Sequence, residues 1–486
     1  MRLRPQGNPS LARLNFVYIM ADDHGRQATS CYGGRLLQTP NIDRIAREGV
    51  LFNHAFACNS ICSPSRATLL TGKYNHLCGV RKLSESFDRS QQTFPKLLRQ
   101  AGYQTAIVGK WHLATEPAGF DFFSVLPGQG SYVDPRFKES GQPWGRGERG
   151  GVLKHGYVTD LITDAAISWL SNRASAKPFC IMVHHKAPHS PHRPAARHLD
   201  LFKDKVFPEP PTLLDDYNDR APEPVAKQLA WSRLVQQAEP QYAPTLQKLI
   251  GDRTQDTRVV YQEYVRNYLR LVVALDENVG RLLDFLDHSG LATNTVVIYT
   301  SDNGYFLGEH GFYNKMWMYE ESIRLPLVIR MPPGLRTLPP GSTSDALVGM
   351  LDIAPTILDL AALAVPADVQ GRSLRPILQG NTAGWRNAFY YHYYGTIAPP
   401  RDDNWIAWHE ILGVRTRTSK LVFYPTWKHG PFWEYFDLQT DPHETNNLCN
   451  AASAQKPPAE LKALLRSLAA EYKDAEAAAL IDGAAR

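Results

Sequence analysis

Residues 15–24 read Asn-Phe-Val-Tyr-Ile-Met-Ala-Asp-Asp-His, a short apolar run that ends in two carboxylates and a histidine. Three further apolar runs have the same form, at residues 105–108, 179–183 and 296–299, and helical patterns lie between them. Short apolar runs that alternate with helices are typical of an α/β protein whose strands are buried on both faces. The chain is therefore predicted to fold around a buried sheet covered by helices.

The predicted helices lie between these runs. Pro40 suits the first turn of a helix that ends near Gly49, an apolar stripe marks a helix around residues 161–169, and residues 261–286 form a long helix. Residues 202–258 carry a weaker pattern and a cluster of prolines, which indicates a surface insertion.

The pattern changes after residue 376. Aromatic, alternating segments at residues 389–394, 413–424 and 433–438 predict antiparallel strands, and residues 459–475 predict a closing helix. We therefore expect a catalytic domain over residues 1–375 and a small sheet-and-helix domain over residues 376–486.

The bulk properties exclude several classes of protein. The net charge is only +5, from 53 basic and 48 acidic residues, which does not favour a nucleic-acid partner. No apolar stretch is long enough to cross a membrane, and no signal sequence is recognised, so a cytoplasmic protein, or a mature form without its leader, is expected. The six cysteines are expected to be free thiols.

Reactive side chains follow each of the four predicted strands. Asp22 and Asp23 follow the first, Gly109-Lys-Trp-His112 the second, His184 to His189 the third, and Ser301-Asp302-Asn303 the fourth. Ligands of open α/β sheets bind beyond the carboxyl ends of the strands, so these groups are expected to share one rim. Asp22 and Asp23 alone would suit a helix cap, but together with Asp302 and Asn303 they form an oxygen-rich set that suits calcium or magnesium.

Cys62 opens the segment Cys-Ser-Pro-Ser-Arg-Ala-Thr-Leu-Leu-Thr-Gly, residues 62–72. Pro64 suits the first turn of a helix, which would place Cys62 at a helix N-terminus where an anion is favoured, with Arg66 one turn further on. A buried structural thiol and a thiolate nucleophile are two alternative interpretations. Neither alternative explains why Pro64 and Arg66 stand at these spacings.

This segment resembles the signature of the type I sulfatases, in which the cysteine of Cys-x-Pro-x-Arg is oxidised to formylglycine by a converting enzyme. The resemblance extends over nearly the whole chain, through residues 22–24, 39–43, 109–112, 187–189, 301–304, 307–315 and 435–448. It implies an alkaline-phosphatase-like fold, with a large mixed sheet between helices and a small C-terminal antiparallel sheet.

The resemblance also implies roles for individual residues. Cys62 would become the formylglycine, whose hydrated aldehyde attacks sulfur, and the metal, calcium or magnesium, would be held by Asp22, Asp23, Asp302, Asn303 and the modified Cys62. Arg66, Lys110 and Lys315 would neutralise charge on the sulfate. His189 would protonate the leaving oxygen, and His112 would take a proton from the second hydroxyl, which then expels sulfate.

The resemblance is strongest to carbohydrate sulfatases of the glucosamine-6-sulfatase-like group, at residues 156–164, 185–189 and 314–321. The expected partners are a sulfated small molecule or oligosaccharide and the formylglycine-generating enzyme. Two enzymatic alternatives stay open, an arylsulfatase and a phosphate or phosphonate monoester hydrolase of the same superfamily. A non-catalytic binding protein would show damage at Cys62, Arg66 or Lys110, and the sequence shows none.

Overall fold

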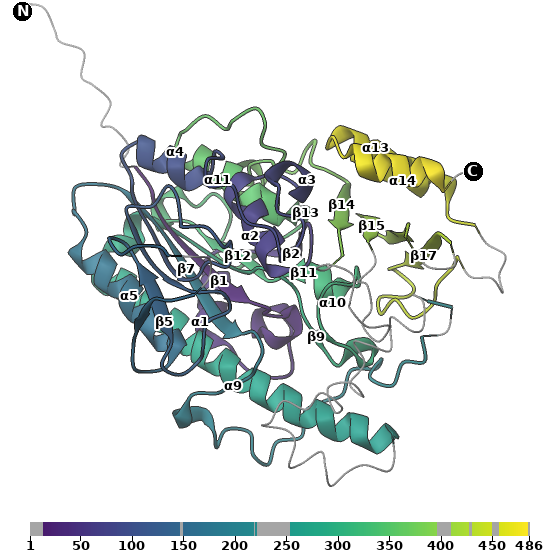
Figure 1. The fold of residues 1–486 in the computed structure, drawn as a ribbon, viewed down its shortest axis with the longest axis horizontal. Coiled ribbons are helices and arrows are strands. Elements are labelled where there is room, and N and C mark those ends of the chain that lie inside the picture. The colour runs from purple at the N-terminus through teal and green to yellow at the C-terminus, as the bar shows by residue number, and fades with distance from the viewer. Residues whose placement is uncertain are drawn as a thin grey trace, which may run out of the picture.

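The computed structural model describes residues 13–145, 149–217, 219–220, 253–395, 410–426, 430–449 and 456–484. These residues build a large sheet between two layers of helices, with a smaller sheet beside it (Figure 1). The predicted α/β architecture with a small C-terminal antiparallel sheet is confirmed. Most of the predicted insertion at residues 202–258 lies outside the described residues.

The large sheet has 11 strands and is mixed. Its central strands are parallel: β8 (Thr295–Ser301), β1 (Asn15–Asp22), β7 (Phe179–Pro188), β3 (Gln104–Lys110) and β4 (Phe122–Leu126). On one side, β12 (Leu327–Arg330) runs antiparallel to β8 and to β2 (Val50–Phe56), and β2 also pairs with β11 (Arg324–Leu325) and β13 (Ser342–Gly349). At the other edge stand β5 (Arg136–Glu139) and β6 (Val152–Leu153).

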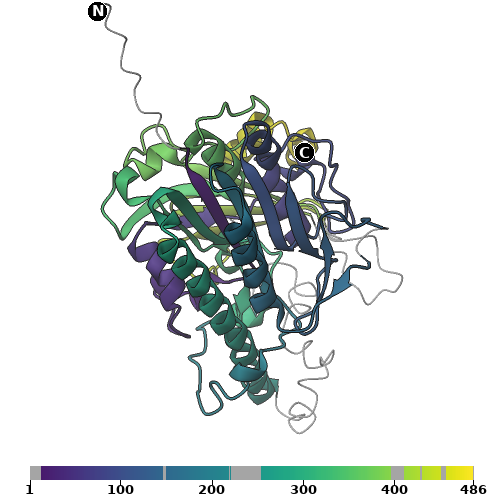
Figure 2. The ribbon, with the colours of Figure 1, turned by 90° about the vertical axis from the view of Figure 1, so that its left-hand side faces the viewer.

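Alternation along β1 explains why helices cover both faces of this sheet. Val17, Ile19 and Ala21 face one core, which they share with α1 (Pro40–Arg47), α5 (Val158–Asn172) and α9 (Arg253–His288). Phe16, Tyr18 and Met20 face the other core, shared with α2 (Cys62–Thr71), α4 (Phe94–Gln100) and α11 (Ile353–Leu360). Successive side chains of a strand point to opposite faces, so a strand with an uninterrupted apolar run has to be covered on both faces. Figure 2 shows α5 and α9 crossing one face of the sheet.

The predicted elements differ from the structure mainly at their ends. The long helix α9 begins at Arg253, well before the predicted residue 261. Residues 413–424 are not one strand but a hairpin of β15 (Ile411–Thr416) and β16 (Ser419–Tyr424). The closing helix is also divided, into α13 (Ala459–Glu471) and α14 (Ala475–Gly483). The chain turns at Lys473, which has a φ of 62°, and the Asp474 side chain accepts from the Ala477 N–H and caps α14.

The small sheet consists of β14 (Ala388–Tyr393), β15, β16 and β17 (Phe432–Asp437), all antiparallel, and it packs against α13. Buried ion pairs attach it to the large domain: the Lys420 ammonium on β16 donates to the Met318 carbonyl oxygen at 2.8 Å and pairs with Glu320 and Glu444. These contacts fix the chain just after Lys315. The domain boundary near residue 376 stays a prediction.

Two further expectations concern the cysteines and the membrane. All six cysteines are free thiols, as predicted. Within the described ranges, no helix is both long enough and apolar enough to cross a bilayer. The cytoplasmic location stays a prediction.

Candidate active site

The strand ends bring the predicted groups to one rim of the large sheet. Asp22 and Lys110 are the last residues of β1 and β3, His189 follows the end of β7, and Asp302 and Asn303 follow β8. The register pairs Asp22 with Pro188 and Ala21 with Ser301, so these segments end side by side. The expected convergence of four separate segments is therefore observed.

Three carboxylates crowd together at this rim. Asp22, Asp23 and Asp302 are at most 1% exposed, and each offers an oxygen within 4.8 Å of the others. Burial and the neighbouring Asp22 raise the pKa of Asp302 to about 7. Packing three buried carboxylates is unfavourable unless cations balance them, and a divalent cation is one such balance.

Asn303 completes this oxygen set. Its Nδ2 donates to Asp23 Oδ1 at 3.2 Å and to Asp302 Oδ1 at 3.0 Å, whereas its own Oδ1 is buried without a hydrogen-bond partner among the described residues. A buried carbonyl oxygen without a donor is rare and calls for a ligand. Three carboxylates and one free amide oxygen fit a hard divalent cation such as calcium or magnesium.

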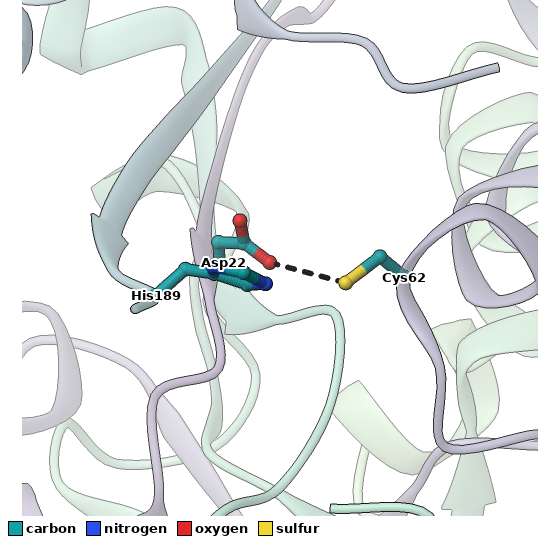
Figure 3. Close-up of side chains that lie close together, drawn as sticks. All are labelled: Asp22, Cys62 and His189. Carbon is teal, nitrogen blue, oxygen red and sulfur yellow. Dashed lines mark hydrogen bonds between the residues drawn. The ribbon is translucent and has the colours of Figure 1, made fainter. Parts of the chain in front are cut away.

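Cys62 is the first residue of α2, as the sequence predicts, and its sulfur faces the carboxylates. The sulfur lies 3.6 Å from Asp22 Oδ1 and 3.5 Å from Lys315 Nζ. Figure 3 shows that the Asp22 carboxylate and the His189 ring both point toward it. Burial raises the pKa of the Cys62 thiol to about 12, so a thiolate nucleophile is disfavoured at neutral pH.

Three cations surround the carboxylates and Cys62. The Arg66 guanidinium donates through Nε and Nη2 to Asp302 Oδ2, at 3.0 and 2.8 Å, and through Nη1 to the Lys110 carbonyl oxygen at 2.7 Å. The Lys110 ammonium pairs with Asp22, and the Lys315 ammonium pairs with Asp23. Arg66 thus holds Asp302, a carboxylate of the candidate metal site, which the sequence motif does not reveal.

The two histidines assigned to proton transfer have lowered pKa values. Burial lowers the pKa of each ring, and Lys110 lowers it further, although Asp22 acts in the opposite direction. His189 Nδ1 lies 2.5 Å from the Ser190 carbonyl oxygen, which only accepts, so Nδ1 carries the proton and Nε2 lies 3.6 Å from Asp23 Oδ2. The His112 backbone carbonyl accepts from the Ser63 hydroxyl at 2.7 Å, which ties the histidine to α2.

Strained backbone occurs at several of these positions. Asp23 has a φ of 66° and His112 a φ of 56°, and Asn314 and Met316, on either side of Lys315, have φ values of 78° and 96°. Residues other than glycine rarely adopt this left-handed region, and such strain concentrates at functional sites. The folded chain therefore holds the side chains of Asp23, His112 and Lys315 in positions that local backbone preference alone would not give.

Two further histidines, in segments that carry the resemblance, also have partners in the structure. His24 lies between the Tyr299 hydroxyl, at 2.6 Å, and the Ala28 carbonyl oxygen, at 3.1 Å, which is a structural environment. His310 pairs with Asp215 at 2.9 Å. Sequence analysis missed Tyr132, whose hydroxyl donates to the His189 carbonyl oxygen at 2.5 Å, because no motif surrounds it.

The fold and this cluster of buried carboxylates, cations and Cys62 together suit a hydrolase of anionic esters, with cations for the anion and oxygen ligands for a divalent metal. A family model described as Sulfatase matches residues 14–363, and a second, described as N-sulphoglucosamine sulphohydrolase, C-terminal, matches residues 308–471. The chain belongs to the sulfatase family, whose members hydrolyse sulfate esters and generally use a metal and a formylglycine.

Individual relatives agree with this assignment. The chain is 42% identical to an N-acetylglucosamine-6-O-sulfatase of Bacteroides thetaiotaomicron, over 95% of this chain and 87% of the relative. It is 26% identical to an arylsulfatase of Clostridium perfringens, over 90% of each. A solved structure of a protein in complex with its substrate D-glucosamine-2-N,6-O-disulfate superposes with a TM-score of 0.84 at 41% identity, over 95% of this chain and 98% of that one.

A more distant structure shares the fold alone. The phosphonate monoester hydrolase of Agrobacterium radiobacter superposes with a TM-score of 0.71 at 21% identity, over 95% of this chain and 96% of that one.

Proposed function

We propose that this sulfatase releases inorganic sulfate from a sulfated glucosamine-type saccharide, with Cys62 converted to formylglycine and calcium as the metal. One observation carries the site assignment: Cys62, at the start of α2, lies within 3.6 Å of a carboxylate of the candidate metal site and of the Lys315 ammonium. The saccharide is proposed from the 42% identical relative, whose own activity is that of an N-acetylglucosamine-6-O-sulfatase.

Asp22, Asp23, Asp302 and Asn303 would hold the metal, which supplies Lewis acidity toward the sulfate oxygens when bound. Calcium is proposed over magnesium because carboxylates and an amide from the chain itself supply the oxygen donors, whereas magnesium usually keeps several of its waters. Conversion of Cys62 by a formylglycine-generating enzyme would replace the thiol with an aldehyde, whose hydrate carries the attacking hydroxyl.

The residues of the chain would bind the anion and move the protons. Lys110 and Lys315 stand at the carboxylates Asp22 and Asp23, where they would also balance the negative charge that builds up on sulfate. Arg66 is proposed to contribute to the same balance through its contacts to Asp302.

His189 is proposed to donate a proton to the leaving oxygen. Its Nδ1 proton is held by Ser190, so Nε2 is the donor atom and has to take up a proton first, which Asp22 and the negative charge of a bound sulfate ester favour. His112, whose Nδ1 has no hydrogen-bond partner among the described residues, is proposed to accept the proton of the second hydroxyl.

A phosphate or phosphonate monoester hydrolase is the second candidate, because the phosphonate monoester hydrolase fold is shared and the same cations would bind either anion. Sulfate esters carry one negative charge and phosphate monoesters carry about two at neutral pH. Comparing kcat/KM on matched sulfate and phosphate esters of the same alcohol separates these activities.

The direct test is sulfate release from 6-O-sulfated N-acetylglucosamine, from glucosamine-2-N,6-O-disulfate and from an aryl sulfate, using protein co-expressed with a converting enzyme. The saccharide 6-sulfates are expected to give the highest kcat/KM. Cys62→Ala should abolish release, whereas Cys180→Ala, which removes another buried thiol outside the site, should retain it. A higher kcat/KM for the aryl sulfate than for every saccharide would reject the proposed substrate class.

A further inference from the structure

Lys186, on strand β7, is a buried lysine that has no counter-charge among the described residues. The residue is 1% exposed, and its ammonium has no hydrogen-bond or ion-pair partner within the part of the chain that the structure describes. Among the described residues, the ammonium contacts the ring face of Tyr132, whose centroid lies 4.9 Å from Lys186 Nζ. A cation–π contact offsets only part of the loss of hydration of an ammonium.

Three other buried lysines among the described residues do not behave in this way. Lys110 pairs with Asp22, Lys315 with Asp23, and Lys420 with Glu320 and Glu444. Each therefore has a carboxylate inside the protein. An unpaired buried ammonium is unfavourable in the free protein, so its presence points to a function in which an anion arrives from outside.

The ammonium of Lys186 lies next to the candidate active site. Burial and the nearby Lys110 lower the pKa of Lys186 to about 8, while Asp22, Cys62 and Asp23 act in the opposite direction, so all four groups are close enough to influence it. Tyr132 supports the same location, because its ring contacts Lys186 and its hydroxyl donates to the His189 carbonyl oxygen at 2.5 Å.

The site carboxylates are not available to neutralise Lys186. Asp22 and Asp23 already accept Lys110 and Lys315, and the same carboxylates form the oxygen set suited to a divalent cation. A bound cation would add positive charge near Lys186 and make an additional anion more favourable. None of these carboxylates is therefore free for Lys186, and an anionic ligand can supply the counter-charge that the described residues do not.

We propose that Lys186 is a substrate-binding residue that contacts the sulfate group being cleaved, together with Lys110 and Lys315. This inference rests on the proposed function, because it assumes that a sulfate ester occupies the pocket. It gives a role to a residue of the 185–189 segment that the resemblance leaves without one, and it predicts that product sulfate contacts the same ammonium.

The test is the binding of inorganic sulfate to purified, calcium-loaded protein, measured by titration calorimetry for the parent protein and for Lys186→Met. Methionine has similar length and no charge. The dissociation constant for sulfate should rise about 10- to 100-fold, since a hydrogen bond to a charged group is typically of that strength. KM for the sulfated saccharide should rise with it.

Lys138→Met is the matched control. Lys138 is also buried, and its ammonium lies 4.0 Å from the ring centroid of Trp144, but it donates to the Trp144 carbonyl oxygen at 2.5 Å. Lys138→Met should lower the melting temperature and leave sulfate affinity unchanged. Lys186→Met should not lower the melting temperature of the sulfate-free protein, because it removes an unpaired charge rather than a satisfied one.

Unchanged sulfate affinity in Lys186→Met overturns the proposal, and so does a weakened affinity for the disulfated saccharide alone. If Lys186→Met does not fold, Lys186→Gln is measured in the same way, and failure of both variants to fold shows a structural role and overturns the proposal. Sulfate release by the parent protein is measured separately, so a failure of the proposed function is distinguishable from a failure of this inference.

Discussion

Arg66→Met should destabilise the protein far more without calcium than with it. Arg66 is 1% exposed and makes two hydrogen bonds to Asp302 Oδ2, at 3.0 and 2.8 Å, and one to the Lys110 carbonyl oxygen at 2.7 Å. Removing one partner of a buried ion pair costs about 3–5 kcal/mol, because the other charge is left uncompensated. In the metal-free protein we therefore expect about that loss in the free energy of unfolding.

Calcium should reduce this loss, because a bound cation supplies the Asp302 carboxylate with a new positive partner. The assay is urea unfolding of the parent and variant proteins, in excess calcium and in chelator. Arg330→Met is the control: Arg330 is also buried and pairs with Glu48 at 2.9 Å, at a position outside the candidate metal site. Its loss of stability should not depend on calcium. An equal loss for Arg66→Met in calcium and in chelator would refute the assignment of Asp302 to a cation site.

Three further predictions follow from individual contacts. His189→Ala should slow a saccharide sulfate about 10²–10⁴-fold and an aryl sulfate much less, because an aryl oxide leaves without a proton donor; equal slowing of both in steady-state kinetics counts against the leaving-group role. Gly109→Ala should abolish soluble expression or activity, since Gly109 has a φ of 94° and a Cβ there would lie 1.9 Å from the His184 carbonyl oxygen; a variant with normal melting temperature and kcat contradicts this. Burial lowers the pKa of His392, but its contacts to the carboxylates of Asp474, at 2.7 Å, and Glu410 raise that pKa above its usual value of 6.5 overall. A group whose pKa is higher in the folded than in the unfolded state stabilises the protein at low pH. The difference in the free energy of unfolding between the parent and His392→Asn should therefore be complete below pH about 6.5 and should fall as pH rises through the raised pKa. A difference that does not change from pH 5 to 9 contradicts this prediction.

The parts of the fold that the sequence predicts well are the central parallel strands. β1, β3, β7 and β8 are continuous apolar runs because helices cover both of their faces, and that pattern is local. Strand β2 was not predicted, since His54 and Asn53 interrupt it and its main partner β13 lies nearly 300 residues further along the chain. Such pairing depends on tertiary contacts that no local window contains.

The candidate site, like the fold, can be predicted only in part from the sequence. The positions of reactive residues after the predicted strands, together with the Cys62 segment, predict from the sequence alone that Cys62 and the residues of the candidate metal site lie close together. They do not reveal that Arg66 holds Asp302, because those two residues are 236 positions apart and meet only when α2 packs against the end of β8. Nor do they reveal that Lys186 has no counter-charge within the described part of the chain, because that property depends on every side chain around it.

The state of Cys62 in active enzyme tests the account most directly. Protein co-expressed with a formylglycine-generating enzyme is assayed for sulfate release, and the peptide that contains Cys62 is then analysed by mass spectrometry. The account predicts an aldehyde at position 62 in a proportion that tracks kcat across preparations. A fully active preparation in which residue 62 is an unmodified thiol would contradict it.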